Sequence, residues 1–272
     1  KKLSNLFYRI SVYDVDKVIE LCKFLKNNNI IVNDIICRTT GPSILSAAKV
    51  CKIFNIGRVS DDLANCVYSK SFFSKKLKKN GIPHFKTKKL NVYRKIVLKN
   101  KWVMKPDAPL IGKKFIYLFQ NEKIPHNKFK IVKKMSHNSQ VCLTKYMSGN
   151  DINIVFFIEK KTKKISLLSI LNEWNFFRNK EINNQNINSV SGVSTPEIFM
   201  KANQKRLLLR YSQKILKMFP KYYGFFNIAF RINKNKVIPY EMNINIDTIY
   251  AQKIFPYFFK KKSTYDLEIE NI

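Results

Sequence analysis

The chain has 272 residues and a mass of 32.1 kDa, and 45% of its residues are hydrophobic and 13% aromatic. This composition excludes a disordered chain and provides enough core for two small domains or one large one. Lys and Arg number 51 against 18 Asp and Glu, a formal net charge of +33 that would ordinarily indicate a nucleic-acid-binding protein. The basic residues are spread along the whole chain and Lys predominates, so we interpret most of the charge as compositional drift.

The cysteines and the apolar runs exclude several other classes. Five cysteines form no CxxC pair and cluster with no histidine, so neither a zinc site nor a disulfide framework is expected. No apolar run approaches the ~18 residues of a transmembrane helix, and no apolar signal-peptide core stands at the start. These observations predict a cytoplasmic protein without a membrane segment.

The first 66 residues predict an α/β unit. Apolar residues recur at helical spacing over 14–25 and again over 43–54, which predicts two helices. Between them, the β-branched run 30–37 is typical of a buried parallel strand. Because such a sheet normally opens with a strand and this sequence opens near a helix, we expect a leading βα unit to be missing.

The rest of the chain predicts a mixture of strands and helices. A basic helix is expected over 69–81, and the longest amphipathic helix over 202–219. Expected strands cover 102–105, 114–119, 141–146, 152–159 and 165–171. Residues 224–233 and 236–243 predict a hairpin that turns at Lys234-Asn235.

Four segments contain recognisable patterns in a fixed order. The first joins Ser69-Lys70 to a helix that ends in Gly81-Ile82-Pro83, and the second is Val103-Met104-Lys105-Pro106 with a loop through Gly112. The third is Leu143-Thr144-Lys145-Tyr146-Met147-Ser148-Gly149-Asn150-Asp151. The fourth is Gly224-x-x-Asn227-Ile228-x-Phe230 followed by Glu241-Met242-Asn243. Together, over about residues 60–245, they resemble the ATP-grasp superfamily, in particular its carbamoyl-phosphate-synthetase-like and biotin-carboxylase-like branch.

The resemblance implies a mixed α+β and α/β fold in three parts. Residues 1–66 correspond to a partial pre-ATP-grasp, Rossmann-like domain. Residues 67–144 correspond to the N-terminal ATP-grasp subdomain. Residues 145–272 correspond to the C-terminal subdomain, which contains the metal-site strands.

The resemblance also implies ATP and Mg²⁺ as cofactors, and it selects the residues that bind the nucleotide. Lys70 and Lys105 would contact the phosphates as compact charges, and the backbone of the loop at Gly112 would cover them. Thr144, Lys145 and Met147 would hold adenine, and Asp151 would accept hydrogen bonds from the ribose.

The expected metal site lies on the last hairpin. Strand alternation places Glu241 and Asn243 on one face, and the resemblance makes them the Mg²⁺ ligands. The family has its other ligand where this chain has Ala229, which cannot coordinate a metal. Asn245 stands in place of the family's arginine, and we expect Arg231, on the neighbouring strand, to supply that catalytic charge.

The implied activity is that of an ATP-dependent ligase. Such an enzyme phosphorylates a small-molecule carboxylate to an acylphosphate, which an amine or similar nucleophile then attacks. Ala229, Asn245, Thr144 in place of the hinge glutamate and a loop with two prolines leave a second interpretation open, a catalytically impaired relative that binds nucleotide or serves as a scaffold. A basic protein that binds polyanions or nucleic acid is a third, although no specific nucleic-acid partner is expected.

Overall fold

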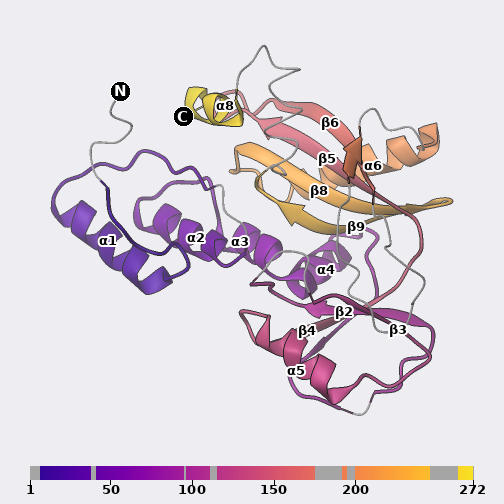
Figure 1. Cartoon of the computed structure of the whole chain (residues 1–272). Helices are drawn as coiled ribbons and strands as arrows, with labels where there is room; N and C mark the ends of the chain where they lie inside the picture. Colours follow the sequence, from indigo (N-terminus) through magenta and orange to yellow (C-terminus); the bar gives the residue numbers. More distant parts are fainter. Residues whose placement is uncertain are drawn as a thin grey trace.

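The computed structural model describes residues 7–37, 41–94, 96–110, 115–174, 192–194, 200–245 and 263–271. Two antiparallel sheets lie one above the other, with α4 between them (Figure 1). The smaller sheet has the order β1-β4-β2-β3 and comprises β1 (Thr87–Leu90), β2 (Lys101–Pro106), β3 (Tyr117–Gln120) and β4 (Val141–Lys145). The larger has the order β7-β6-β5-β8-β9 and comprises β5 (Asn150–Ile158), β6 (Ile165–Trp174), β7 (Gly192–Ser194), β8 (Gly224–Asn233) and β9 (Lys236–Asn243). The mixed fold class predicted from the sequence is confirmed.

Side-chain caps fix the starts of three of the four N-terminal helices. These helices are α1 (Val15–Asn27), α2 (Ser43–Ile53), α3 (Asp61–Tyr68) and α4 (Lys70–Lys79). The Asp14 carboxylate accepts from the first turn of α1, and the hydroxyls of Ser60 and Ser69 do the same for α3 and α4. Three further helices follow, α5 (His126–Lys134), α6 (Ala202–Leu216) and α8 (Thr264–Glu270). None of the helices in the described ranges is long and apolar enough to cross a bilayer.

The strand expected over 30–37 is absent, and that prediction is wrong. This segment pairs with no strand among the described residues, and Ile31 is 81% exposed. A β-branched run forms a strand only where a neighbouring strand completes its hydrogen bonds, and described residues 7–66 provide none. The segment instead brings Asp34 and Ile35 into contact with the rest of the fold.

Each sheet has its own hydrophobic core. The smaller sheet packs on α5 around Phe119, Phe129 and Met104. The larger sheet packs against α2, α3, α4 and α6. Phe73 and Leu77 of α4 belong to this larger core, although α4 precedes the smaller sheet in sequence. Helix α4 is therefore anchored on the larger sheet while its N-terminus reaches the end of β2. The domain boundaries expected from the sequence stay a prediction.

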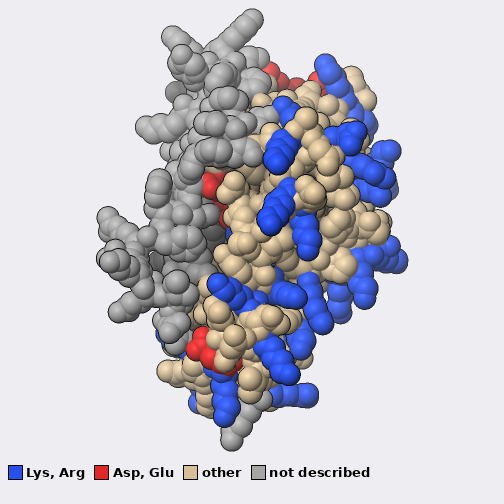
Figure 2. All heavy atoms as spheres, turned by 90° about the vertical axis from the view of Figure 1, so that its right-hand side faces the viewer, with Lys and Arg blue, Asp and Glu red and all other residues tan. Residues whose placement is uncertain are grey.

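Basic side chains are distributed broadly over the surface. Figure 2 shows one face of the molecule, on which Lys and Arg are scattered from top to bottom among other residues. They do not form a single stripe on the described part of this face. A scattered arrangement attracts polyanions weakly and without sequence preference.

A buried cluster around Arg58 joins three distant parts of the chain. The Arg58 side chain is 4% exposed, and it donates to the Tyr223 carbonyl at 3.1 Å and to the Glu268 carboxylate at 2.5 Å. It also donates to the carbonyl of Ile35. Asp34 lies 3.6 Å from Arg58 and accepts from the Tyr223 hydroxyl at 2.5 Å and from Lys160 at 3.0 Å. The N-terminal segment, the start of β8 and α8 are thereby held together by charge-assisted hydrogen bonds.

The Arg58 cluster predicts a loss of stability in acid. Burial alone would raise the pKa of Asp34, but hydrogen bonds from Tyr223 and Lys160 and the charge of Arg58 lower it below the ordinary value of 3.8. A carboxyl whose folded pKa is depressed stabilises the fold above its unfolded pKa, and this contribution disappears as pH falls through the folded value. We therefore expect the urea midpoint to fall below about pH 4, and to fall less steeply in Asp34→Asn. If the urea midpoints of the unmodified chain and of Asp34→Asn depended on pH in the same way, Asp34 would not be the group responsible for the loss of stability.

Candidate functional site

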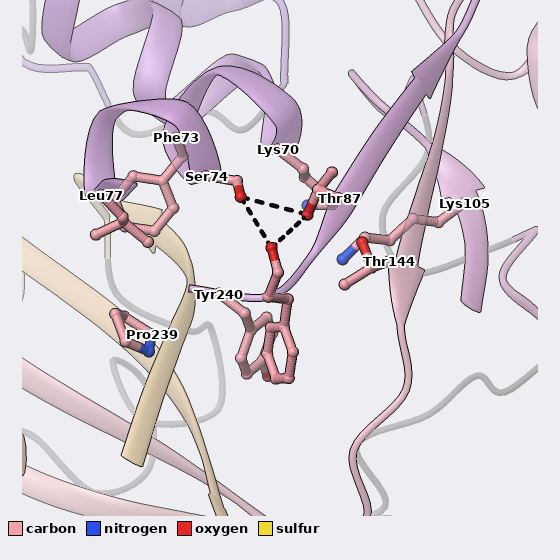
Figure 3. A pocket seen from close by; sticks show the side chains of 10 residues that line it. Lys70, Phe73, Ser74, Leu77, Thr87, Lys105, Thr144, Pro239 and Tyr240 are labelled. Atoms are coloured by element: carbon pink, nitrogen blue, oxygen red, sulfur yellow. Dashed lines mark hydrogen bonds between the residues drawn. The ribbon is translucent and has the colours of Figure 1, made fainter. Parts of the chain in front are cut away.

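A pocket lies between the two sheets, beside the first half of α4 (Figure 3). Its lining residues come from α4, β1, β2, β4, β9 and the segment before β1: Lys70, Phe73, Ser74, Leu77, Phe85, Thr87, Lys105, Thr144, Pro239 and Tyr240. In Figure 3 the Lys105 side chain extends from β2 into the pocket, opposite the ring of Tyr240. Two lysines in a pocket with apolar and hydroxyl-bearing walls favour a ligand with several negative charges.

A buried carboxylate fixes the position of both lysines. Asp107 follows β2 directly, and its side chain accepts from the hydroxyl of Ser69 at 2.7 Å, the N–H of Ser71 at 2.8 Å and the amide of Asn138 at 2.8 Å. Its carbonyl accepts from the N–H of Lys70 at 3.0 Å. The start of α4 is therefore fastened to the end of β2, so Lys70 and Lys105 face the same space. Sequence reasoning missed Asp107. A usable signal was that the chain has only 18 acidic residues and that one of them directly follows the strand ending at Pro106.

The two lysines differ in the way their charges are balanced. The Lys70 amine lies 3.2 Å from the Glu241 carboxylate, and both side chains are mostly buried. Lys105 lies 5.9 Å from the centre of the Tyr240 ring. Burial lowers the pKa of Lys105, and the nearby charge of Lys70 lowers it further. An anion bound beside Lys105 would stabilise the charged form of this lysine. The electrostatics of the pocket therefore favour anion binding.

A bulge in β9 brings an additional side chain into the pocket. Ala229 pairs with Glu241 and Phe230 pairs with Pro239, so Tyr240 is an extra residue between them. Tyr240 and Glu241 consequently both reach the pocket side instead of opposite faces of the strand. Burial, followed by the charges of Asp151 and Glu173, raises the pKa of Tyr240 well above its ordinary value. Its hydroxyl is therefore a neutral group over the physiological pH range.

The larger sheet presents a polar face on the side of Glu241. Asn243 pairs with Asn227, and Ala229 pairs with both Glu241 and Asn153. Asn227 is 8% exposed, and its Oδ1 atom is buried without a hydrogen-bond donor in the described part of the chain. An unpaired buried acceptor on a polar sheet face is the kind of group that a cation or its water shell satisfies. Hard oxygen donors of this kind fit Mg²⁺, which uses one or two carboxylates and keeps several waters.

Arg231 and Asp151 form a pair with each other. They are opposite in the β5–β8 register, and the Arg231 guanidinium donates to both Asp151 oxygens, at 2.5 and 2.8 Å. Arg231 also donates to the Met147 carbonyl at 3.0 Å. The resemblance gives the two residues independent roles, in catalysis and in ribose binding. In this structure they act on one another and hold Met147, in the segment between β4 and β5, against β8.

Three residues at the junction of β4 and β5, namely Thr144, Lys145 and Met147, differ in what they can offer a ligand. Thr144 lines the pocket, whereas the Lys145 side chain is exposed and its N–H donates to the Lys86 carbonyl at 2.9 Å. The N–H of Met147 has no acceptor among the described residues. Met147 is partly exposed, so this N–H is available to a ligand with a hydrogen-bond acceptor. Gly112 lies outside the described residues.

Comparisons with known proteins place the fold. No family model and no curated protein matches the sequence. Solved structures do match. The N5-carboxyaminoimidazole synthetase of Staphylococcus aureus, solved with ADP, is matched over 99% of this chain at 12% identity and a TM-score of 0.68. The L-amino acid ligase of Bacillus licheniformis is matched over 87% at 12% identity and a TM-score of 0.60. The fold is that of the ATP-grasp proteins.

Other matched structures agree with this fold. The biotin carboxylase domain of 2-oxoglutarate carboxylase from Hydrogenobacter thermophilus, solved with MgADP, is matched over 90% of this chain at 12% identity and a TM-score of 0.60. The chain spans 55% to 66% of the length of these three proteins. At these identities the ATP-grasp likeness establishes the arrangement of the two sheets.

Proposed function

We propose that this chain binds Mg·ATP between its two sheets and uses it to activate a carboxylate. The observation that supports this most directly is that Lys70 and Lys105 line one pocket at the junction of the sheets, with Glu241 in contact with Lys70. Lys70 and Lys105 would neutralise the phosphates, and the unpaired N–H of Met147 would donate to the base. Lys70 would exchange its contact with Glu241 for a phosphate oxygen. When bound, Mg²⁺ would be held by Glu241 and Asn243 and would neutralise phosphate charge.

The proposed reaction has two steps. An oxygen of the substrate carboxylate attacks the γ-phosphorus of ATP, and the bond from this phosphorus to the bridging oxygen breaks, releasing ADP. An amine or similar nucleophile then attacks the acyl carbon of the acylphosphate, and inorganic phosphate leaves. The contribution of this chain is to position the reactants and neutralise charge with Lys70 and Lys105. The ligases among the matched structures support the class of reaction.

A thermal shift tests nucleotide binding. We expect Mg·ATP to raise the melting temperature, because a ligand that binds only the folded state adds about 2.7 kcal/mol of stability at a 100-fold excess over its dissociation constant. The matched control is magnesium tripolyphosphate at the same ionic strength, which has the phosphate charge without adenosine. Equal shifts for the two ligands would indicate diffuse attraction to a chain of net charge +33, and would contradict a nucleotide site.

A second candidate function is nucleotide binding without phosphoryl transfer. Ala229 and Asn245 favour it, because neither can supply the ligand or the positive charge that the resemblance leads us to expect. Trapping of acylphosphate with hydroxylamine, in the presence of ATP and a mixture of small carboxylates, separates the two functions. Hydroxamate formation supports the ligase, and its absence with intact ATP binding supports the binding protein.

A further inference from the structure

The polar face of the larger sheet contains a donor that could replace the missing ligand at Ala229. We propose, on the basis of the Mg·ATP function above, that the amide oxygen of Asn153 on β5 binds the divalent cation together with Glu241 and Asn243 on β9. Glu173 on β6 holds the Asn153 amide in the orientation that this requires. The cation site would thus extend across three strands, over the side chain of Ala229.

The strand register places these groups in one row. Glu241 pairs with Ala229, and Ala229 pairs with Asn153, so the three residues follow one another across β9, β8 and β5. Neighbouring strands are about 4.8 Å apart, which places the β9 and β5 backbones about 9.6 Å apart along this row. A glutamate and an asparagine side chain, with two metal–oxygen bonds of about 2.1 Å each, can bridge that distance. Because the side chain between them is a single methyl group, it leaves the space open.

Hydrogen bonding fixes the Asn153 amide. The Asn153 side chain is 94% buried, since its exposed fraction is 6%, and its Nδ2 group donates to the Glu173 carboxylate. The Oδ1 atom is therefore directed away from Glu173, and no donor to it is present in the described ranges. A carboxylate that orients a metal ligand through a hydrogen bond is a common supporting arrangement at metal sites.

A second acceptor on the same face points to a cation independently. Asn227 lies two residues before Ala229 on β8, and its buried Oδ1 atom is also without a donor in the described part of the fold. Among the acidic side chains nearby, Asp151 is neutralised by Arg231 and Glu241 contacts Lys70. Once phosphate draws Lys70 away, this face has oxygen acceptors in excess of donors, which is the condition for binding a hard cation.

Titration with Mn²⁺ tests the proposal, since this ion prefers the same oxygen ligands and its free form is measured directly by electron paramagnetic resonance. The titrations use the full chain with and without ADP. We expect Asn153→Asp to bind Mn²⁺ about tenfold more tightly, because ligand charge sets the affinity of such sites. The matched control is Asn235→Asp, which adds the same charge in the exposed turn between β8 and β9. We expect Glu173→Ala, which removes the acceptor that orients Asn153, to weaken binding by about 10- to 100-fold.

Three further variants, Ala229→Glu, Asn227→Ala and Asn153→Ala, keep the test decisive. Ala229→Glu should also tighten Mn²⁺ binding, and its effect should not add to that of Asn153→Asp, because both fill the same part of one coordination shell. Equal affinities for Asn153→Asp and Asn235→Asp would overturn the proposal, as would weakening by Asn227→Ala with none by Asn153→Ala. Those results leave the proposed function intact if Mg·ATP still raises the melting temperature. Absence of both Mn²⁺ binding and that thermal shift in the unmodified chain would overturn the function itself.

Discussion

Replacing Arg58 with Ala is expected to destabilise the chain by about 3–5 kcal/mol, the cost of leaving a buried charge without its partner. Glu268 is 2% exposed and would lose the guanidinium that now lies 2.5 Å from it. The carbonyls of Ile35 and Tyr223 would lose a donor as well. The measurement is the free energy of unfolding from urea denaturation.

The matched control for Arg58 is an exposed ion pair in the same part of the fold. Lys49 and Asp61 lie 3.4 Å apart with side chains about half exposed, and such pairs contribute about 0–1 kcal/mol. Lys49→Ala should therefore leave the urea midpoint almost unchanged. Glu268→Gln is a milder test of the same cluster, because the amide keeps an acceptor while removing the charge. If Arg58→Ala and Lys49→Ala lose similar stability, the Arg58 cluster does not hold the three segments together.

Replacing Lys105 with Ala is expected to weaken ATP binding by about 10- to 150-fold, which corresponds to the 1.5–3 kcal/mol of a hydrogen bond to a charged group. Lys105 extends into the pocket from the end of β2, where burial and Lys70 already lower its pKa. Bound phosphate would gain most from this residue because little water competes for it. Isothermal titration of both proteins with Mg·ATP measures the effect.

Lys101 provides the control for Lys105. It begins the same strand but is exposed and does not line the pocket. In a chain of net charge +33, any lysine contributes to the general attraction of anions. Lys101→Ala should therefore reduce ATP affinity only slightly. This small reduction should disappear at high salt, because salt screens exposed charges. Equal losses for the two variants would show that ATP affinity arises from the overall charge.

The β8–β9 hairpin shows how far the sequence could be interpreted directly. Both strands and the turn at Lys234-Asn235 lie where they were predicted, because long and largely apolar segments flank a short polar turn. Helices α3 and α5 were missed, since eight or nine residues give too few helical repeats for the periodicity to be clear. For α3, the Ser60 cap followed by Asp61 and Asp62 was a usable signal.

Other parts of the site depend on contacts that no single segment contains. Tyr240 reaches the pocket because of a bulge, and a bulge is determined by the pairing of two strands. Arg231 pairs with Asp151 because the β5–β8 register places them opposite one another, and the sequence patterns gave no register. Lys70, Lys105, Thr144 and Glu241 were predicted from the resemblance. In the structure the first three line one pocket, and Glu241 contacts Lys70. Their roles in binding stay a prediction.

The Arg58 cluster also affects how this chain folds during its synthesis. Arg58 and Glu268 are separated by 210 residues, which a ribosome needs about 10–40 s to add at 5–20 residues per second. Until Glu268 has emerged, the N-terminal helices cannot bury Arg58 with its full set of partners. The unit formed by α1–α3 is therefore expected to stay incomplete on the ribosome, with apolar surface available to chaperones, and to reach its final packing only after β8 and α8 have been made.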